Sequence, residues 1–320
     1  MSFSPLRCAV VGVGYLGRFH AQKYKALPEA ELIGVCDLRE EQGRQVANEL
    51  GVEWFASYQD LKGQVDAVTV ASTTSSHYEI ARYLLSNGIH VHVEKPMTST
   101  SIEGQELCQL ADSHGLKLQV GHIERFNPAF VAAREKLQRP LFIECHRLAP
   151  FKPRGFDVSV VLDLMIHDLD VILSLVNSEP VDVSAIGTPV LTGDIDIANA
   201  RVEFASGTVA NITASRVSQK SERKFRVFQG SQYLSMDFGA GEVRLLTKTG
   251  EWGGDSLPLS QDVWSLEKGD ALLAETAAFV RSVRENQPCV VTGQDGLMAL
   301  KLAEQIEADI RGRLGRIGNS

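Results

Sequence analysis

The chain has 320 residues, of which 44% are apolar and 22% charged, and its formal net charge is −8. This length suffices for two domains with substantial cores, and the composition is typical of a globular protein. The negative charge argues against general nucleic-acid binding, although a local basic pocket can still hold a small anion. No apolar run is long enough to span a membrane, so we expect no membrane partner and a cytoplasmic location.

The five cysteines are scattered along the chain and are never spaced as C-x-x-C. This pattern favours free, buried thiols in a reducing compartment over a disulfide framework. It also gives no sign of a zinc site, and we expect no bound metal.

The first part of the chain alternates strand-like and helix-like segments, which is typical of parallel βαβ units. The expected strands are 6–11, 32–36, 67–71, 90–93 and 116–120. The expected helices are 16–26, 40–50, 76–86 and 102–114. We therefore predict an α/β protein whose N-terminal domain, residues 1–122, is a doubly wound parallel sheet of the Rossmann type.

After Gly121 the pattern changes to a series of strands with few helices between them. The expected strands are 142–147, 181–186, 198–204, 208–215, 223–229, 232–237 and 242–247. The expected helices are 128–137, 158–175, 268–285 and 295–311. Residues 123–320 are thus predicted to form an α+β domain with a large, mostly antiparallel open sheet. One face of that sheet would be exposed, so we expect a homodimer or a homotetramer.

A glycine-rich turn, Gly12-x-Gly14-x-x-Gly17, follows the first expected strand and opens the first expected helix. In this context Gly12 allows the tight turn, and Gly14 leaves room for a pyrophosphate against the backbone. Gly17 lets the helix pack closely on the strand, so that the N–H groups at its N terminus face the phosphates. The turn therefore predicts a dinucleotide site.

Asp37 ends the second expected strand, twenty residues after Gly17. A carboxylate at this position accepts hydrogen bonds from the adenosine ribose and repels a 2′-phosphate, which favours NAD over NADP. The alternative is that Asp37 only caps the helix that starts near Glu40.

The tripeptide Glu94-Lys95-Pro96 follows the expected strand 90–93. Open α/β sheets bind ligands outside the carboxyl ends of their strands, where Lys95 would offer a cation beside the cofactor. Pro96 fixes the chain after the lysine and helps to hold its direction. The alternative is that Lys95 only pairs with Glu94 on the surface.

Asp163, His167 and Asp170 lie at i, i+4 and i+7 of the expected helix 158–175, which places them on one helical face. The residues around them are largely apolar, and charges on a buried helix are costly unless they pair or line a cavity. His167 has an unperturbed pKa near neutrality and can take a proton from an alcohol, while Asp163 orients its ring. The alternative for His167 is a histidine satisfied within the core.

In their order and spacing, these motifs resemble the Gfo/Idh/MocA family of NAD(P)-dependent sugar and cyclitol dehydrogenases, over essentially the whole chain. Segment 70–77 looks like that family's loop beside the nicotinamide. The resemblance implies that Lys95 contacts the substrate and the nicotinamide ribose, and that Asp163 and His167 serve the proton transfer. It also implies cofactor contacts from Gly12, Gly14, Tyr15, Leu16, Gly17, Asp37, Ser72, Thr73, His77, Glu94 and Lys95.

Two positions depart from the family's pattern. The family often has proline where Thr73 stands, and glycine where Met165 stands. The first departure implies a slightly altered cofactor loop. The second implies a subgroup with different packing beneath the substrate, which makes glucose or inositol less favoured substrates.

Segments 121–128, 215–218 and 223–226 are similar to family members that oxidise the C3 hydroxyl of UDP-N-acetylglucosamine. That activity feeds 3-amino sugars into lipid A or other surface polysaccharides. The resemblance implies that Arg125 and Asn127 bind the sugar, together with Lys95, Arg154, Asp163 and His167.

A local surplus of cations is compatible with this substrate, because arginine forks suit a diphosphate. Arg147, Lys152 and Arg154 flank the loop before the expected helix 158–175. The alternative is that the latter two are solvated loop residues, and that the basic residues of 223–226 form the outer face of a strand.

With this resemblance, the sequence predicts an NAD-dependent oxidoreductase that takes a hydride from a secondary alcohol carbon of a sugar, C3 of UDP-N-acetylglucosamine. A free sugar, a cyclitol or a sugar acid is the alternative substrate. Two other functions stay open. An NAD-dependent glycosidase would release sugar without net NADH, and a non-enzymatic NAD-responsive regulator predicts loss of the lysine or of the Asp–His pair.

Overall fold

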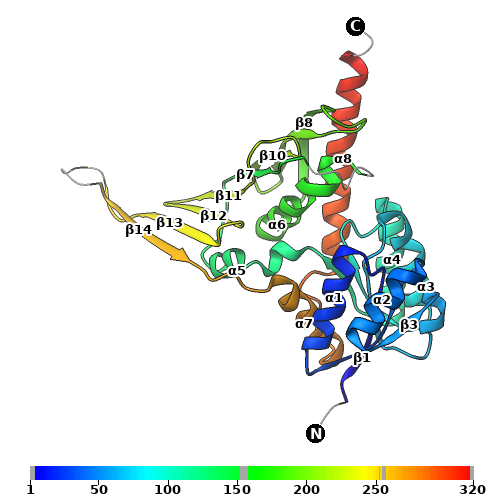
Figure 1. The fold of residues 1–320 in the computed structure, drawn as a ribbon. Coiled ribbons are helices and arrows are strands. Elements are labelled where there is room, and N and C mark those ends of the chain that lie inside the picture. Colours follow the sequence, from blue (N-terminus) through cyan, green and yellow to red (C-terminus); the bar gives the residue numbers. More distant parts are fainter. Residues whose placement is uncertain (1–3, 152–157, 252, 254–256, 318–320) are drawn as a thin grey trace. The chain divides into compact units, whose positions relative to one another are not determined.

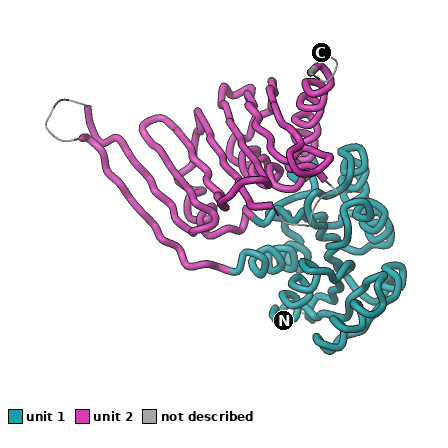
Figure 2. Tube along the Cα trace, turned by 45° about the horizontal axis from the view of Figure 1, so that its top comes forward, with its two compact units in different colours: residues 1–123, 270–297 teal, residues 124–269, 298–320 magenta. Residues whose placement is uncertain are grey.

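A computed structural model of the chain describes residues 4–151, 158–251, 253 and 257–317. The chain divides into two compact units (Figure 2), unit 1 with residues 1–123 and 270–297, and unit 2 with residues 124–269 and 298–320. The expected division at 122/123 did not include the return of 270–297 to unit 1. That return has a packing reason, because Phe279 and Val280 belong to the same core cluster as Val10 and Tyr24.

Unit 1 contains a six-stranded sheet in the order β3-β2-β1-β4-β5-β6, with every pairing parallel. The central strand β1 and the edge strand β3 of this sheet are labelled in Figure 1. Its strands are β1 (Leu6–Val11), β2 (Ala30–Cys36), β3 (Glu53–Phe55), β4 (Ala67–Val70), β5 (His90–Glu94) and β6 (Leu118–Gly121). The strand order reverses between β1 and β4, which is where doubly wound sheets bind ligands. The predicted Rossmann architecture is confirmed.

The helices of unit 1 begin and end at recognisable signals. They are α1 (Tyr15–Ala26), α2 (Glu40–Leu50), α3 (Thr74–Ser86), α4 (Ser101–His114) and α7 (Ala271–Arg284), with a 3₁₀ turn η1 (Tyr58–Leu61). Thr100 and Glu103 form a capping box at the start of α4. Gly51 and Gly115 end α2 and α4 in the left-handed conformation. The division between the units at 297/298 falls within α8 (Gly293–Ile317).

Unit 2 contains an eight-stranded sheet in the order β14-β13-β12-β11-β7-β10-β9-β8. Its strands are β7 (Phe142–Leu148), β8 (Pro180–Thr188), β9 (Ile197–Phe204), β10 (Val209–Ser215), β11 (Glu222–Gln229), β12 (Gln232–Asp237), β13 (Glu242–Lys248) and β14 (Leu259–Ser265). Only β7 and β10 pair in parallel, so the predicted, mostly antiparallel sheet is confirmed. The edge strand β14 was not predicted, since most of its residues are exposed and show no apolar alternation.

The inner face of this sheet packs on α5 (Pro128–Arg134), on α6 (Ile166–Val176) and on α8. Inward side chains of the strands, such as Ile143, Ile212 and Val227, are fully buried in this core. The outward side chains of the same strands are half-buried or exposed. Within the described part of unit 2, no helix covers this outer face.

All five cysteines are free and buried, as the sequence predicted. In the described part of the chain, none of the helices has the length and apolarity needed to cross a membrane.

Candidate active site

The glycine-rich turn joins β1 to α1 with the geometry that a dinucleotide requires. Gly12 has a φ of +83°, and a Cβ there would lie 2.6 Å from the Ser72 backbone. A Cβ on Gly17 would lie 1.8 Å from the carbonyl oxygen of Gly12, so only glycine allows this close packing. At Gly14 the nearest atom to such a Cβ is 3.9 Å away, on Arg39, so the backbone there is open to a ligand.

The N terminus of α1 is suited to an anion. Gly14 is its N-cap residue, and among the described residues no side chain caps it. Uncapped N–H groups at a helix N terminus bind phosphate. Tyr15 and Leu16, in the first turn, are both exposed. A groove of about 760 Å³ adjoins this turn, lined by Val13, Gly14, Tyr15, Arg18, Phe19, Gln22, Arg39, Glu41, Gln42, Gln45 and Val46.

Asp37 lies at the end of β2 and faces the glycine turn. Its carboxylate accepts hydrogen bonds from the N–H groups of Val13 and Arg39, both at 2.9 Å. The N-cap residue of α2 is Arg39, so Asp37 does not cap that helix. A carboxylate with further lone pairs beside the phosphate-binding turn fits the ribose of a dinucleotide. The chain's own residues therefore fit NAD.

His77 lies between two loops at the carboxyl edge of the sheet. Its side chain is buried, with Nδ1 3.0 Å from the Pro96 carbonyl oxygen and Nε2 3.1 Å from that of Ser72. Burial lowers its pKa, and a neutral imidazole can donate to only one of these two oxygens. The geometry gives His77 the task of joining the loops. Thr73, the N-cap residue of α3, is exposed.

Glu94, at the end of β5, is buried inside unit 1. Its carboxylate accepts hydrogen bonds from His20 Nε2 at 2.7 Å and from the Lys95 backbone N–H at 3.2 Å. A Cβ on Gly121 would lie 3.0 Å from this carboxylate, so glycine makes the room that Glu94 needs. His20 follows the glycine turn on α1, and it therefore links the cofactor helix to the backbone of Lys95.

A second buried histidine and a glutamate lie next to this pair. The rings of His92 and His20 meet edge to face with centroids 5.2 Å apart, and His92 Nε2 is 3.8 Å from Glu275 Oε2. Ligand-type atoms of His20, Glu94 and Glu275 lie within 4.8 Å of one another, as they would around a metal. The hydrogen bond from His20 to Glu94 already explains the closest of these approaches.

Asp163 and His167 lie on the central helix of unit 2, but that helix is not α-helical throughout. Residues Val161–Met165 form a π-helical turn, η3, which leads directly into α6. In a π turn the hydrogen bonds run from i to i+5, so residues four apart are not stacked as the predicted α-helix would stack them. Both side chains are half-buried. Such π turns occur frequently at functional sites.

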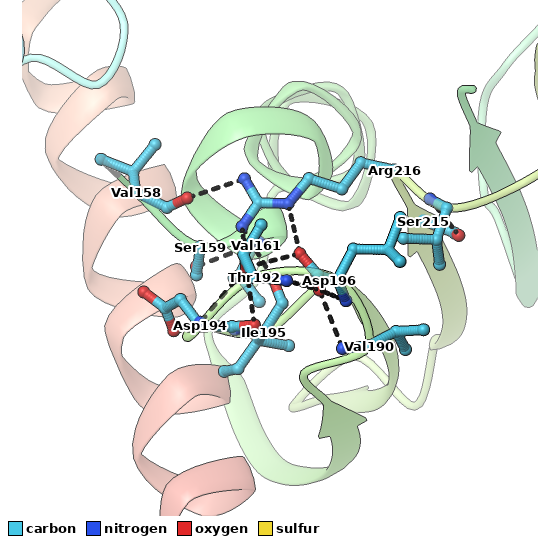
Figure 3. Close-up of polar contacts among 12 residues, drawn as sticks. Val158, Ser159, Val161, Val190, Thr192, Asp194, Ile195, Asp196, Ser215 and Arg216 are labelled. Carbon is cyan, nitrogen blue, oxygen red and sulfur yellow. Dashed lines mark hydrogen bonds and ion pairs between the residues drawn. The ribbon is translucent and has the colours of Figure 1, made fainter. Parts of the chain in front are cut away.

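The start of this helix is anchored by a buried ion pair (Figure 3). Arg216 donates from Nε to Asp196 at 2.9 Å and from Nη1 to the Val158 carbonyl oxygen at 2.9 Å. Asp196 also accepts the N–H groups of residues 190–192, and these bonds outweigh burial and hold its pKa well below the usual range. Ser159 then accepts from the first N–H groups of the π turn.

A buried cluster of charges follows His167 in the chain. Arg147 donates from Nε and Nη2 to both oxygens of Asp168, at 2.9 and 2.8 Å, and from Nη1 to Glu124 at 2.8 Å. All three side chains are at least 95% buried. All three guanidinium nitrogens of Arg147 thus already bind buried carboxylates, so we no longer count it among the cations for a diphosphate.

The residues expected to bind the sugar have partners of their own in unit 2. Asn127 caps α5 by accepting from the Ala129 N–H, and its amide donates to Glu124 and to the Phe238 carbonyl oxygen. Arg125 lies 3.7 Å from Asp170.

The other expected cations differ in where they lie. Arg154 and Lys152 lie outside the described residues. Lys224 and Arg226 lie on the outer sheet face, where Arg226 pairs with Glu144 at 2.6 Å, as the alternative interpretation held. They are therefore paired or solvated strand residues. That alternative fails for Arg223, which alternates with the inward Phe225 and lies 3.8 Å from Glu124.

Sequence reasoning did not single out His20, Glu124 or Asp168, and it gave Arg147 a different task. A signal for Arg147 was present, because it continues the inward positions of Ile143 and Cys145 along β7. Its partners lie far away in sequence, so the pairing itself had no local signal.

Two family models match the chain. An oxidoreductase family model with an NAD-binding Rossmann fold matches residues 6–122, and the GFO/IDH/MocA C-terminal domain model matches residues 137–232. The UDP-N-acetylglucosamine 3-dehydrogenase of Acidithiobacillus ferrooxidans is 38% identical over an alignment of 316 residues that covers 97% of this chain and 99% of that protein. The chain belongs to the Gfo/Idh/MocA oxidoreductase family.

Solved structures and a second curated relative are also similar to this chain. The solved structure of the Acidithiobacillus enzyme has a TM-score of 0.90 and 37% identity, covering 97% of this chain and 99% of that one. The NAD(+)-dependent scyllo-inositol 2-dehydrogenase of Bacillus subtilis is 31% identical over 67% of this chain and 68% of its own. A scyllo-inositol dehydrogenase of Lactobacillus casei, solved with NAD(H), shares the fold with a TM-score of 0.81 at 22% identity, covering 97% of this chain and 98% of that one.

These comparisons confirm the predicted Gfo/Idh/MocA membership, the oxidoreductase class and NAD as the cofactor. Within the family, the dinucleotide is bound by the Rossmann fold that unit 1 forms. The roles of individual residues stay predictions.

Proposed function

We propose that this Gfo/Idh/MocA member oxidises the C3 hydroxyl of UDP-N-acetylglucosamine to a ketone. The observation that carries the proposal is the 38% identity to a UDP-N-acetylglucosamine 3-dehydrogenase along almost the full length of both chains. Segments 121–128 and 215–218, which resemble that subgroup, supply the buried Glu124 and Arg216 contacts of unit 2. The proposal thus commits to one substrate and one hydroxyl.

The proposed reaction needs a hydride acceptor, a general base and a hydrogen-bond donor to the oxygen. Bound NAD supplies the hydride acceptor, held through Gly14, the first turn of α1 and Asp37. His167 removes the proton of the alcohol as a general base, and the negative charge of Asp163 stabilises the imidazolium that forms. Lys95 donates to the developing ketone oxygen, and its backbone is fixed through Glu94.

We assign contact or positioning tasks to the other expected residues. Ser72 and Thr73 border the site at the start of α3, whereas His77 and Glu94 are buried and position the loops next to them. Asn127 has its amide engaged within unit 2, so we assign it a positioning task rather than a sugar contact.

A free cyclitol is the second candidate substrate. The scyllo-inositol 2-dehydrogenase of Bacillus subtilis supports it through 31% identity over two thirds of the chain. Neither the glycosidase nor the regulator is favoured by a specific observation. Lys95, Asp163 and His167 are all present, whereas a regulator would be expected to have lost some of them.

We further propose that the enzyme is a cytoplasmic homodimer or homotetramer that associates through the outer sheet face of unit 2. That face carries an aromatic row, with ring centroids 5.6 Å apart for Phe142 and Phe228 and 4.9 Å apart for Phe228 and Tyr233. Aromatic side chains on a sheet face suit an isologous contact with a second copy. Light scattering of Phe228→Glu should show smaller particles than the wild type, and an unchanged mass would contradict this interface.

The decisive experiment measures NADH formation with UDP-N-acetylglucosamine, free N-acetylglucosamine and scyllo-inositol. The first should be turned over with the highest kcat/KM, and His167→Asn should lower kcat by about 10²- to 10⁴-fold with little change in NAD binding. His114→Asn, on the exposed end of α4, is the matched control. If only scyllo-inositol is turned over, the substrate is a cyclitol and the proposed nucleotide sugar is wrong. Full activity of His167→Asn would refute the role of His167 as general base.

A further inference from the structure

We infer that Arg147 is a positioning residue for the proposed reaction, whose guanidinium fixes the helix of His167 relative to the segment of Arg125. The inference rests on the proposed function of that helix. It concerns a side chain that the catalytic scheme itself does not use.

The contacts of Arg147 join three elements of unit 2. The residue lies on β7, on the inner side of the sheet, with only 4% of its surface exposed. Two of its nitrogens meet both oxygens of Asp168 on α6, and the third meets Glu124, in the 3₁₀ turn η2 (Ile123–Phe126). A rigid guanidinium fork that uses three nitrogens at once fixes direction as well as distance.

Both carboxylates are chain neighbours of residues in the proposed site. Asp168 follows His167, and Glu124 precedes Arg125, so fixing these side chains restrains the backbone from which the neighbours project. A second ion pair, Arg125 to Asp170 at 3.7 Å, connects the same two segments. Two charged contacts therefore hold these segments together: the Arg147 cluster and the Arg125–Asp170 pair.

The energetics argue that stability alone does not account for this cluster. Taking an arginine and two carboxylates out of water is costly, and apolar side chains of similar volume often give equal or greater stability. Burial raises the pKa of Asp168, and the charge of Arg147 opposes that rise. Arg223 adds little, because it is more than half exposed and lies 3.8 Å from Glu124. The cluster is better explained by the fixed backbone geometry that it gives to the neighbouring His167 and Arg125.

The test is steady-state kinetics of Arg147→Lys, with Glu124→Gln as a milder second variant in case the first folds poorly. Lysine keeps the charge but replaces the planar fork, so it cannot hold both carboxylates in the same geometry. We expect kcat per folded enzyme to fall about 10- to 100-fold, because small misplacements of catalytic groups lower rates by such factors. The KM for NAD should stay within about twofold, because unit 1 holds the dinucleotide.

Arg313→Lys is the matched control, since it alters an arginine–carboxylate pair on α8, with Asp309 at 3.1 Å, outside the proposed site and the proposed association face. A double variant, Arg147→Lys with Glu124→Gln, should lose no more activity than the worse single variant, because the two side chains act as one unit. Thermal unfolding of each variant separates activity per folded molecule from lost protein.

Two results would be decisive against the inference. If the wild type turns over substrate and kcat is unchanged in folded Arg147→Lys and Glu124→Gln, the positioning role of Arg147 is wrong and the proposed function still stands. Absence of NADH formation by the wild type with every sugar overturns the proposed function, and this inference with it.

Discussion

Substituting His92 by asparagine should flatten the dependence of stability on pH. The side chain is fully buried on β5, where it faces Thr69, His20, Glu94 and Glu275. Burial and the neighbouring His20 outweigh the attraction of Glu94 and lower its pKa from 6.5 to about 3. The folded protein therefore keeps this imidazole neutral at pH values where the unfolded chain protonates it.

The sign and size of the effect follow from proton linkage. Because the pKa in the folded state is depressed, the unfolded state binds more protons between pH ~6.5 and pH ~3, and stability falls as the pH decreases through this window. Between about pH 7.5 and about pH 5, the last ~1.5 pH units lie below the pKa of the unfolded histidine. Over them the unfolding free energy falls by ~1.4 kcal/mol per pH unit. His92 alone should thus cost the folded state about 2 kcal/mol over that interval.

The measurement is urea unfolding of wild type and His92→Asn at these two pH values. The loss of unfolding free energy between them should be smaller by about 2 kcal/mol in the variant, whatever its stability at the higher pH. His77 and His90, whose pKa values burial also lowers, titrate in both proteins and cancel in the comparison. His114→Asn, which removes an exposed histidine, should leave the difference unchanged. Equal pH dependence in wild type and His92→Asn would refute the reasoning.

Three further predictions concern the cofactor turn and unit 2. Asp37→Ser should raise the KM for NAD and lower the preference for NAD over NADP by about tenfold or more, measured as the ratio of kcat/KM values. Gly17→Ala should lower the unfolding free energy by about 1–3 kcal/mol, since its Cβ would overlap the Gly12 carbonyl oxygen, whereas Gly315→Ala, with open space around it, should not. Asn127→Ala should lower it by about 1–2 kcal/mol in urea titrations, through loss of the α5 cap and of the bond to Glu124.

The parts of the fold that local patterns determine were predictable from the sequence. The alternation of apolar strands and amphipathic helices specified the parallel sheet of unit 1, because each βαβ unit buries its own apolar face. The glycine turn and Asp37 were predictable together, since residue spacing alone brings the ends of β1 and β2 side by side. The structure adds the hydrogen bond that connects them, from the Val13 N–H to Asp37.

Features that depend on distant partners were not predictable in the same way. The return of 270–297 to unit 1 depends on the packing of Phe279 against the first βαβ unit. The π turn at Val161–Met165 has no local composition signal that separates it from an α-helix. Asn127 was expected to bind a sugar, yet its amide is used by Glu124 and Phe238, which no short motif reveals.

Buried carboxylates precede or follow the proposed site residues at three places in the chain. Glu94 precedes Lys95, Asp168 follows His167, and Glu124 precedes Arg125, and each carboxylate is bound by a buried cation or histidine. A charged side chain that is taken out of water persists only where its partners have a fixed geometry, so it restrains its own backbone strongly. The neighbouring residue then projects from a fixed peptide, although its own long side chain stays adaptable. Lys95 and Arg125 are flexible side chains, and this arrangement supplies the precision that they lack by themselves.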